Sequence, residues 1–310
     1  MIRLVDKQRI SITEGLALGT AQLGMRYGIA NVVGRPDARL SSEIIAEAYR
    51  QGVRFFDTAQ DYGESETILG EAFAGFGIGA DVRVITKLSS RIVATGDINL
   101  VRQSLETSLR RLNIASLWAV LLHGEMQLDQ LQGWLGDIVR QAKEDGLLQR
   151  FGVSVYAPER ALQALEMEAI DVVQVPCNAF DRRMRQAGVF ERARDCGKSV
   201  FVRSVYLQGL ALLEPDNMPI AIPGARKAVR ALIRFCDHEG VSRQRFAISY
   251  IRWMAPESPL VIGAESVQQL VANCGIILAE PLPVELHRAW EELYRHEHPQ
   301  LIDPRTWPRT

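Results

Sequence analysis

The chain has 310 residues, of which 47% are hydrophobic and 24% charged, and its formal net charge is -1. This composition is typical of a globular protein, and the lack of a basic surplus argues against a general binder of nucleic acid or anionic membranes. Four widely spaced cysteines without a CxxC pair, no apolar run of membrane-spanning length and no leader-like start favour a cytoplasmic protein without disulfides.

The opening of the chain predicts a β-hairpin, because two short alternating pieces at 2–5 and 9–12 flank a polar linker. A buried strand is expected at 16–20, followed by a loop at 21–28. The serine pair at 41–42 predicts the start of a helix that runs to about residue 51.

From residue 53 onward, short apolar segments alternate with amphipathic ones. Further strands are predicted at 53–56, 82–87, 117–123, 151–154, 171–175, 199–204 and 260–263. Helices are predicted near 64–74, 98–112, 127–145, 158–167, 184–196, 224–238, 243–254 and 265–273. This alternation indicates a parallel sheet, and eight such units favour closure into a (β/α)8 TIM barrel over an open sheet. We expect a single domain over 1–310, with a core at about 15–275 and a tail at 281–310 that contains a helix near 284–295.

Residues 53–63, VRFFDTAQDYG, combine a strand with two chemically useful side chains. Asp57 closes the apolar run, and Tyr62 follows in the loop, so a carboxylate and a phenol are expected at the same rim of the sheet. Taken alone, the pair is equally consistent with a helix cap and a packed ring. Lys87 and His123 close the next two strands, however, and in a barrel all four residues converge on one mouth.

These four residues suit the protonation of an oxygen that gains negative charge. A phenol is a weak acid at neutral pH, and a nearby ammonium is expected to lower its pKa. Asp57 can pair with Lys87, and His123 can donate a hydrogen bond or relay a proton. The set contains no strong nucleophile, so a carbonyl reduction here requires a bound hydride donor.

Two other sequence patterns resemble ligand-binding motifs, but neither is expected to bind a ligand. The glycines at 75–79 follow a helix and lack the GxGxxG spacing, which indicates a turn and not a dinucleotide fingerprint. His296 and His298 form an H-x-H pair without a third ligand nearby, so no metal site is expected.

The sequence resembles the aldo-keto reductase family. The motifs that carry the resemblance are DTAxxYG at 57–63, the strand-ending Lys87, LLH at 121–123, FGVS at 151–154, VQVP at 173–176 with Asn178, and VIGA at 261–264. The resemblance implies a (β/α)8 oxidoreductase with NADPH, less often NADH, at the barrel mouth, and Tyr62 as acid/base in a tetrad with Asp57, Lys87 and His123. The cofactor-binding residues it implies are Gly19, Thr20, Ser154, Gln174, Asn178, Arg203, Ser204, Tyr206, Gln208, Gly263, Ala264, Ser266, Gln269 and Asn273.

Several residues depart from the family pattern. Val155 stands where the family usually has asparagine, and Arg203 where an aromatic ring normally stacks on the nicotinamide. Arg203 either weakens binding of the cationic, oxidised ring or faces an anionic substrate. The segment 263–269 lacks the usual cation for a 2′-phosphate and contains Glu265, which can accept a hydrogen bond from a free ribose hydroxyl. NADP(H) is expected over NAD(H), with NAD(H) kept as the alternative.

The expected activity is NAD(P)H-dependent reduction of an aldehyde or ketone. The segment 203–210, RSVYLQGL, resembles a subgroup associated with bacterial cell-surface sugar pathways, which favours a small polar or sugar-like substrate. Most of the loop residues that we expect to contact the substrate are polar or charged. These residues are Gln22, Met25, Arg26, Tyr27, Gln60 and Glu125. The alternatives are a sugar dehydrogenase that works in the oxidative direction and a nucleotide-binding regulatory barrel with negligible turnover. A monomer is the simplest expectation.

Overall fold

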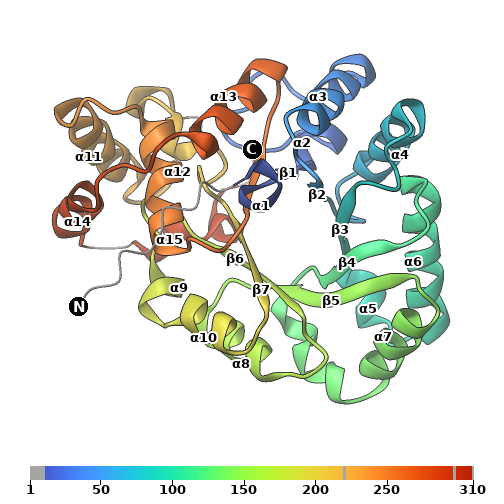
Figure 1. Cartoon of the computed structure of the whole chain (residues 1–310). Coiled ribbons are helices and arrows are strands. Elements are labelled where there is room, and N and C mark those ends of the chain that lie inside the picture. The colour runs from blue at the N-terminus through green and yellow to red at the C-terminus, as the bar shows by residue number, and fades with distance from the viewer. Residues whose placement is uncertain (1–10, 219–220, 296–297, 309–310) are drawn as a thin grey trace, which may run out of the picture.

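The computed structural model describes residues 11–218, 221–295 and 298–308, and its strands close into one parallel barrel (Figure 1). In chain order around the ring, the strands are β1 (Leu16–Gly19), β2 (Phe55–Asp57), β3 (Arg83–Leu88), β4 (Leu117–Leu122), β5 (Leu148–Ser154), β6 (Val172–Pro176), β7 (Ser199–Arg203) and β8 (Leu260–Gly263). β1 closes the ring by pairing with β2 and β8, so that Gly19 lies beside both Asp57 and Gly263. The predicted (β/α)8 barrel is therefore confirmed.

Helices surround these strands (Figure 1). The α-helices are α1 (Ile12–Gly15), α2 (Ala21–Gly24), α3 (Ala38–Arg50), α4 (Ser65–Phe76), α5 (Ser90–Ala94), α6 (Ile98–Leu112), α7 (Trp134–Glu144), α8 (Pro158–Glu166), α9 (Arg183–Gln186), α10 (Val189–Asp195), α11 (Ala225–His238), α12 (Arg243–Met254), α13 (Val267–Leu278), α14 (Val284–Leu293) and α15 (Pro299–Ile302). The 3-10 helices are η1 (Glu125–Gln132), η2 (Leu210–Leu212), η3 (Pro215–Asn217) and η4 (Pro304–Thr306).

The beginning of the chain differs from the prediction. Most of the expected hairpin falls on residues 1–10, which lie outside the described residues. Its second arm was expected to end at Ile12, but α1 begins there, because the Ser11 hydroxyl accepts a hydrogen bond from the Glu14 amide and caps the first turn. α3 also begins earlier than the predicted serine, since Asp37 caps it.

Two segments that were predicted as single helices are interrupted at glycines. The segment 127–145 contains the end of η1 and then α7, with the extended Gly133 between them. The segment 184–196 is divided into α9 and α10 at Gly188, whose φ of 75° favours glycine. Both breaks lie on the outside of the barrel and leave the strand order unchanged.

The N-terminal half of the barrel interior is filled by apolar side chains. Because alternate residues of a strand face opposite sides, every second side chain points inward. The buried inner layer consists of Ala17, Phe55, Ile85, Ala119, Leu121, Val172 and Phe201. The rings of Phe55 and Phe201 meet edge to face across it, with centroids 5.2 Å apart. A ligand therefore has room only at the C-terminal ends of the strands.

The segment after α13 packs against the barrel. Trp290 of α14 is fully buried and donates its indole N–H to the Ala179 carbonyl at 2.8 Å. His287, also on α14, stacks on Trp253 of α12 with ring centroids 5.4 Å apart. Trp307, near the end of the tail, is likewise buried. These aromatic contacts fix the tail to the outer helices.

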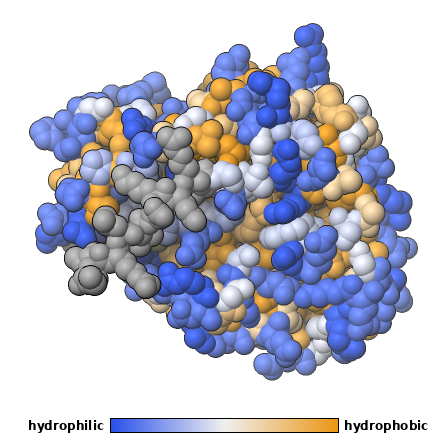
Figure 2. Space-filling view, viewed as in Figure 1, coloured by the Kyte–Doolittle hydropathy of each residue, from blue (hydrophilic) through white to orange (hydrophobic). Residues whose placement is uncertain are grey.

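The outer surface is mainly polar. Figure 2 shows hydrophilic side chains over most of the face in view, with apolar ones gathered in its hollows. Within residues 11–218, 221–295 and 298–308, no helix combines the length and apolar character needed to cross a membrane.

Candidate active site

The polar residues predicted at the strand ends form the next inward layer of the barrel. Asp57 lies two residues after the inward-facing Phe55, and Lys87 lies two residues after Ile85. The same two-residue step gives the other members of the layer, which are His123, Ser154, Gln174 and Arg203. Strand periodicity thus explains why residues far apart in the sequence surround one mouth.

Asp57 is the centre of a buried polar network. The Lys87 ammonium donates to its Oδ1 at 2.7 Å and to the Thr58 carbonyl at 2.9 Å, while the Gln174 amide donates to its Oδ2 at 2.7 Å. Lys87 and Asp57 are only 1% and 3% exposed, so each depends on the other for charge compensation. The pair was predicted from the sequence, but the contact between Gln174 and Asp57 was not.

Two glycines hold Tyr62 at this mouth. A Cβ on Gly24 would collide with the Tyr62 carbonyl oxygen, and a Cβ on Gly63 would collide with the Gly24 carbonyl oxygen. Gly63 also has a φ of 57°. Glycine at both positions therefore lets the loops after β1 and β2 pack closely together.

The catalytic candidates meet around the ring of Tyr62. The Lys87 Nζ lies 5.1 Å from the ring centre, and the His123 ring lies edge-on with its centroid 5.5 Å away. Among the described residues, Lys87 donates its hydrogen bonds to Asp57 and Thr58, and neither Lys87 nor His123 bonds the Tyr62 hydroxyl. The phenol proton is therefore not committed to either residue.

Burial has the largest effect on the acidity of this phenol. The pKa of Tyr62 is raised above its ordinary value, first by burial and then by the Asp57 carboxylate, although Arg203 lowers it. The Lys87 ammonium was expected to lower this pKa, but the pKa is raised overall, because burial and the Asp57 carboxylate have the larger effect. The Lys87 charge is compensated by Asp57, and burial lowers the pKa of the ammonium itself. The phenol therefore stays protonated at neutral pH, and it can act as a proton donor only where a neighbouring group stabilises the phenolate that forms.

His123 is neutral at neutral pH. Burial and the neighbouring Lys87 charge lower its pKa to about 4. Its Nδ1 lies 3.5 Å from a carboxylate oxygen of Asp61, a partner that the sequence analysis did not identify. A neutral imidazole whose Nδ1–H points at that carboxylate has Nε2 as an acceptor, and the ring as a whole lies edge-on to Tyr62.

Arg203 is tied to the end of β5. Its Nε donates to the Ser154 hydroxyl at 3.2 Å, and its other nitrogens donate to the Ser204 hydroxyl at 3.2 Å and the Val155 carbonyl at 3.1 Å. The Ser154 hydroxyl in turn lies 3.5 Å from the Gln174 side-chain oxygen. Within the described residues, the Arg203 guanidinium has hydroxyl and carbonyl partners but forms no ion pair with a carboxylate.

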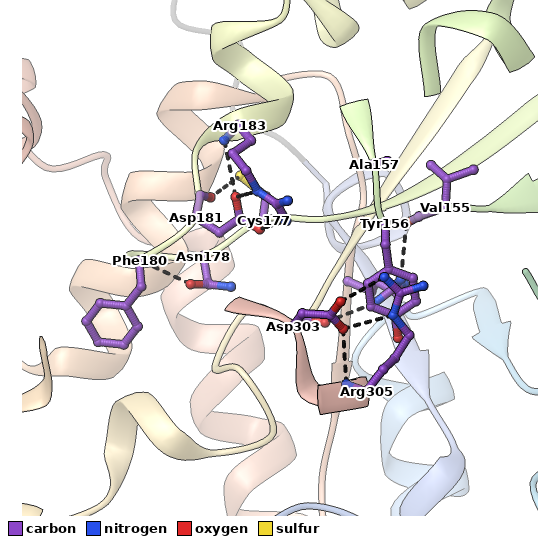
Figure 3. Close-up of polar contacts among 12 residues, drawn as sticks. Val155, Tyr156, Ala157, Cys177, Asn178, Phe180, Asp181, Arg183, Asp303 and Arg305 are labelled. Atoms are coloured by element: carbon purple, nitrogen blue, oxygen red, sulfur yellow. Dashed lines mark hydrogen bonds and ion pairs between the residues drawn. The ribbon is translucent and has the colours of Figure 1, made fainter. Parts of the chain in front are cut away.

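Tyr156 links Arg203 to the C-terminal tail. The guanidinium carbons of Arg203 and Arg305 lie 4.1 and 3.7 Å from the centre of its ring. Arg305 makes two hydrogen bonds of 2.8 Å to the Asp303 carboxylate, and Figure 3 shows this pair against Tyr156. The tail thus reaches the mouth. No sequence motif marked this contact, because its partners are separated by most of the second half of the chain.

A cavity of about 300 Å³ runs from the barrel mouth toward α13. The residues that line its inner end include Asp57, Tyr62 and Gln174. Those that line it toward α13 include Glu265, Gln269 and Asn273. The predicted cofactor residues that line it are Gly19, Thr20, Gln174, Arg203, Ser204, Tyr206, Gln208, Gly263, Gln269 and Asn273.

Other predicted cofactor residues do not line this cavity. Ser154 supports Arg203, Ala264 is buried, and Ser266 caps α13 by accepting a hydrogen bond from the Gln269 amide at 3.2 Å. Asn178 is fully buried, and Figure 3 shows it beside Phe180, whose amide donates to it at 2.9 Å.

Other residues that line the cavity, including Asn31 and Gln244, were not predicted from the sequence. No residue pattern indicated them, because both lie on segments outside the strand ends. Of the residues expected to contact substrate, Gln22 and Tyr27 also line the cavity.

The loop after β7 has an unusual backbone where it lines the cavity. Ser204, Leu207 and Gln208 have left-handed conformations with φ of 63°, 49° and 55°. The Gln208 carbonyl accepts a hydrogen bond from the Ile29 amide at 3.1 Å, which joins this loop to the one after β1. Left-handed non-glycine residues cost energy and cluster at ligand sites, so this loop is shaped for a bound molecule.

The donor set fits an organic cofactor better than a metal. The cavity is lined largely by polar residues from Tyr62 to α13, and its inner end carries a proton donor, which suits a nicotinamide dinucleotide. No cluster of three or more His, Cys, Asp or Glu that could hold a metal ion occurs in the described part of the chain. His296, one of the H-x-H pair, lies outside that part.

Comparisons with known proteins agree with this geometry. The model of the Aldo/keto reductase family matches residues 15–295. Aldo-keto reductase str7 from Strobilurus tenacellus is 23% identical over 278 residues, which are 84% of this chain and 82% of that protein. L-galactose dehydrogenase from Arabidopsis thaliana is 22% identical over 272 residues, 84% and 83% of the two chains. The solved glycerol dehydrogenase AKR11B4 from Gluconobacter oxydans shares the fold, with a TM-score of 0.72, 22% identity, and coverage of 98% and 97%.

Proposed function

Because the chain belongs to the aldo/keto reductase family and is an NAD(P)-dependent oxidoreductase, we propose that it reduces a small polar or sugar-like aldehyde or ketone, with Tyr62 as the proton donor. The observation that carries this proposal is the place of Tyr62, a protonated phenol at the inner end of the cavity with Lys87 and His123 against its ring. The bound nicotinamide supplies the hydride for the carbonyl carbon.

In this proposal the protein residues handle the carbonyl oxygen and its proton. Tyr62 donates its hydroxyl proton to the oxygen as negative charge develops there. The charge that remains on the phenol is stabilised by the Lys87 ammonium, which Asp57 and the Thr58 carbonyl hold in place. His123, neutral at working pH, lies against the Tyr62 ring beside the same group of atoms.

The lining of the cavity supports a set of cofactor residues. Gly19, Thr20 and Gln174 would lie at the nicotinamide end, and Ser204, Tyr206 and Gln208 would run along the pyrophosphate. Tyr206 supports this arrangement because its hydroxyl donates to Asn273 at 2.8 Å and spans from the β7 loop to α13. Family membership by itself favours NADP(H) as the dinucleotide. The residues near α13 also affect the choice between NADP(H) and NAD(H).

The polar mouth supports a hydroxylated substrate. Glu125 accepts hydrogen bonds from the Tyr156 and Ala157 amides at 2.8 and 3.3 Å, and Arg203 contributes a cation that has no carboxylate partner among the described residues. The names of two similar proteins, L-galactose dehydrogenase and glycerol dehydrogenase, point to polyhydroxylated compounds. They also favour a second candidate function, oxidation of such an alcohol, which would use the same residues in reverse.

Steady-state assays with NADH and NADPH against a panel of small aldehydes, ketones and sugars test this proposal. Tyr62→Phe should lower kcat by about 10²–10⁴-fold and leave cofactor binding, followed by tryptophan fluorescence, unchanged. Tyr49→Phe is the matched control, because its hydroxyl bonds Asp81 on the outer surface at 2.8 Å. Cofactor binding without turnover of any panel member would instead support the regulatory-barrel alternative.

A further inference from the structure

Glu265 is a carboxylate without a partner in the cavity. It lies two residues after the end of β8, is half-buried and lines the part of the cavity next to α13. Its backbone amide donates to the Gln269 side chain at 2.8 Å, but within the described residues its carboxylate makes no hydrogen bond or ion pair. Glu265 therefore lines the cavity with a carboxylate that no described residue compensates.

The proposed reaction fixes which end of a dinucleotide meets this carboxylate. The hydride must be delivered beside the proton donor, so the nicotinamide lies at the Tyr62 end. Because the lining of the same cavity reaches α13, the adenosine half would lie at that end, with Glu265, Gln269 and Asn273. This step rests on the proposed function.

The adenosine end offers no cation to a phosphate. Of the described residues that line the cavity, Arg203 alone is cationic, and it is bound at the opposite end to Ser154 and Val155. Arg243, next to the lining residue Gln244, is held by Glu214 at 2.6 Å. Burial raises the pKa of Glu265, and no neighbouring cation offsets that rise.

We propose that Glu265 selects NAD(H) over NADP(H). NADP(H) carries a 2′-phosphate on its adenosine ribose, with a charge of about -1.5 to -2 at neutral pH. Such a group would approach an uncompensated carboxylate, whereas the free 2′-hydroxyl of NAD(H) can donate a hydrogen bond to it. This preference is the reverse of the one expected from family membership.

Dissociation constants for NADH and NADPH, measured by quenching of tryptophan fluorescence, test the proposal in the full chain. The wild type should bind NADH about tenfold or more tightly than NADPH. Glu265→Gln, which keeps the shape and removes the charge, should reduce that ratio severalfold, chiefly by tightening NADPH. Glu265→Arg should bring the ratio to one or reverse it.

Glu257→Gln is the matched control, because Glu257 is an exposed acid before the opposite end of β8. It should leave the NADH to NADPH ratio unchanged. Tighter binding of NADPH by the wild type, or an unchanged ratio in Glu265→Gln, would overturn the selection while leaving the oxidoreductase assignment intact. Failure of both dinucleotides to bind, with no turnover of carbonyl compounds, would instead overturn the proposed function.

Discussion

The ammonium of Lys87 lies 2.7 Å from the carboxylate of Asp57, and both side chains are buried where β3 and β2 end. Removing either partner leaves an uncompensated charge in the barrel. We therefore expect Lys87→Met and Asp57→Leu each to lower the free energy of unfolding by about 3–5 kcal/mol, as measured by urea titration.

The double variant, Lys87→Met with Asp57→Leu, separates the effect of charge pairing on the free energy of unfolding from the effect of packing. It should cost clearly less than the two single changes together, because neither charge then remains alone. Arg140→Met is the control, since its pair with Asp137 is exposed and should contribute less than about 1 kcal/mol. Additive losses in the double variant would contradict a coupled buried pair.

The buried His287 predicts a loss of stability in mild acid. Burial lowers its pKa from 6.5 to about 4, so the unfolded chain binds the proton more readily than the folded one. The contribution of this residue is therefore present above about pH 6.5 and declines as the pH falls toward 4, by up to about 3 kcal/mol.

Urea titrations at pH 7.5 and pH 5 measure this loss. In His287→Gln the group no longer titrates, so the difference between the two pH values should shrink. His238→Gln should retain the full difference, because that ring is 84% exposed. An equal pH dependence in all three proteins would assign the acid sensitivity to other groups.

Arg203 should oppose binding of the oxidised cofactor. Its guanidinium faces the cavity without a carboxylate partner among the described residues, and the oxidised nicotinamide is itself cationic. We expect Arg203→Gln to tighten NAD⁺ relative to NADH by about fivefold or more, as measured by titration of both forms. Arg91→Gln, an exposed change elsewhere, should leave that ratio as it is. If the ratio of NAD⁺ to NADH affinity does not change in Arg203→Gln, the remaining interpretation is that Arg203 binds an anionic substrate.

The contact between Arg305 and Tyr156 predicts that the tail affects substrate binding. A planar guanidinium on an aromatic ring contributes about 0.5–1 kcal/mol at a partly exposed site, so Arg305→Ala should raise KM for the carbonyl substrate about twofold to fivefold. Cofactor dissociation constants should not change. Arg288→Ala, on the exposed side of α14, serves as the control. Equal KM values for both variants would show that the tail does not shape the mouth.

The barrel could be predicted from the sequence because its determinants are local. Short apolar strands such as Leu117–Leu122 alternate with capped amphipathic helices, and each signal needs only a few neighbouring residues. The strand-end positions of Asp57, Lys87 and Gln174 follow from the same periodicity. The helix breaks at Gly133 and Gly188 were not predicted, since an isolated glycine in an amphipathic pattern is compatible with either a continuous or a divided helix.

What the sequence by itself determined is the barrel and the set of polar residues at its mouth, because strand alternation fixes which side chains point inward. Only the tertiary structure decided how those residues interact. Gln174 bonds Asp57, burial raises the pKa of Tyr62 above its ordinary value, and Arg305 of the tail packs on Tyr156. Desolvation and long-range contacts depend on the whole packed molecule, so they leave no pattern in neighbouring residues.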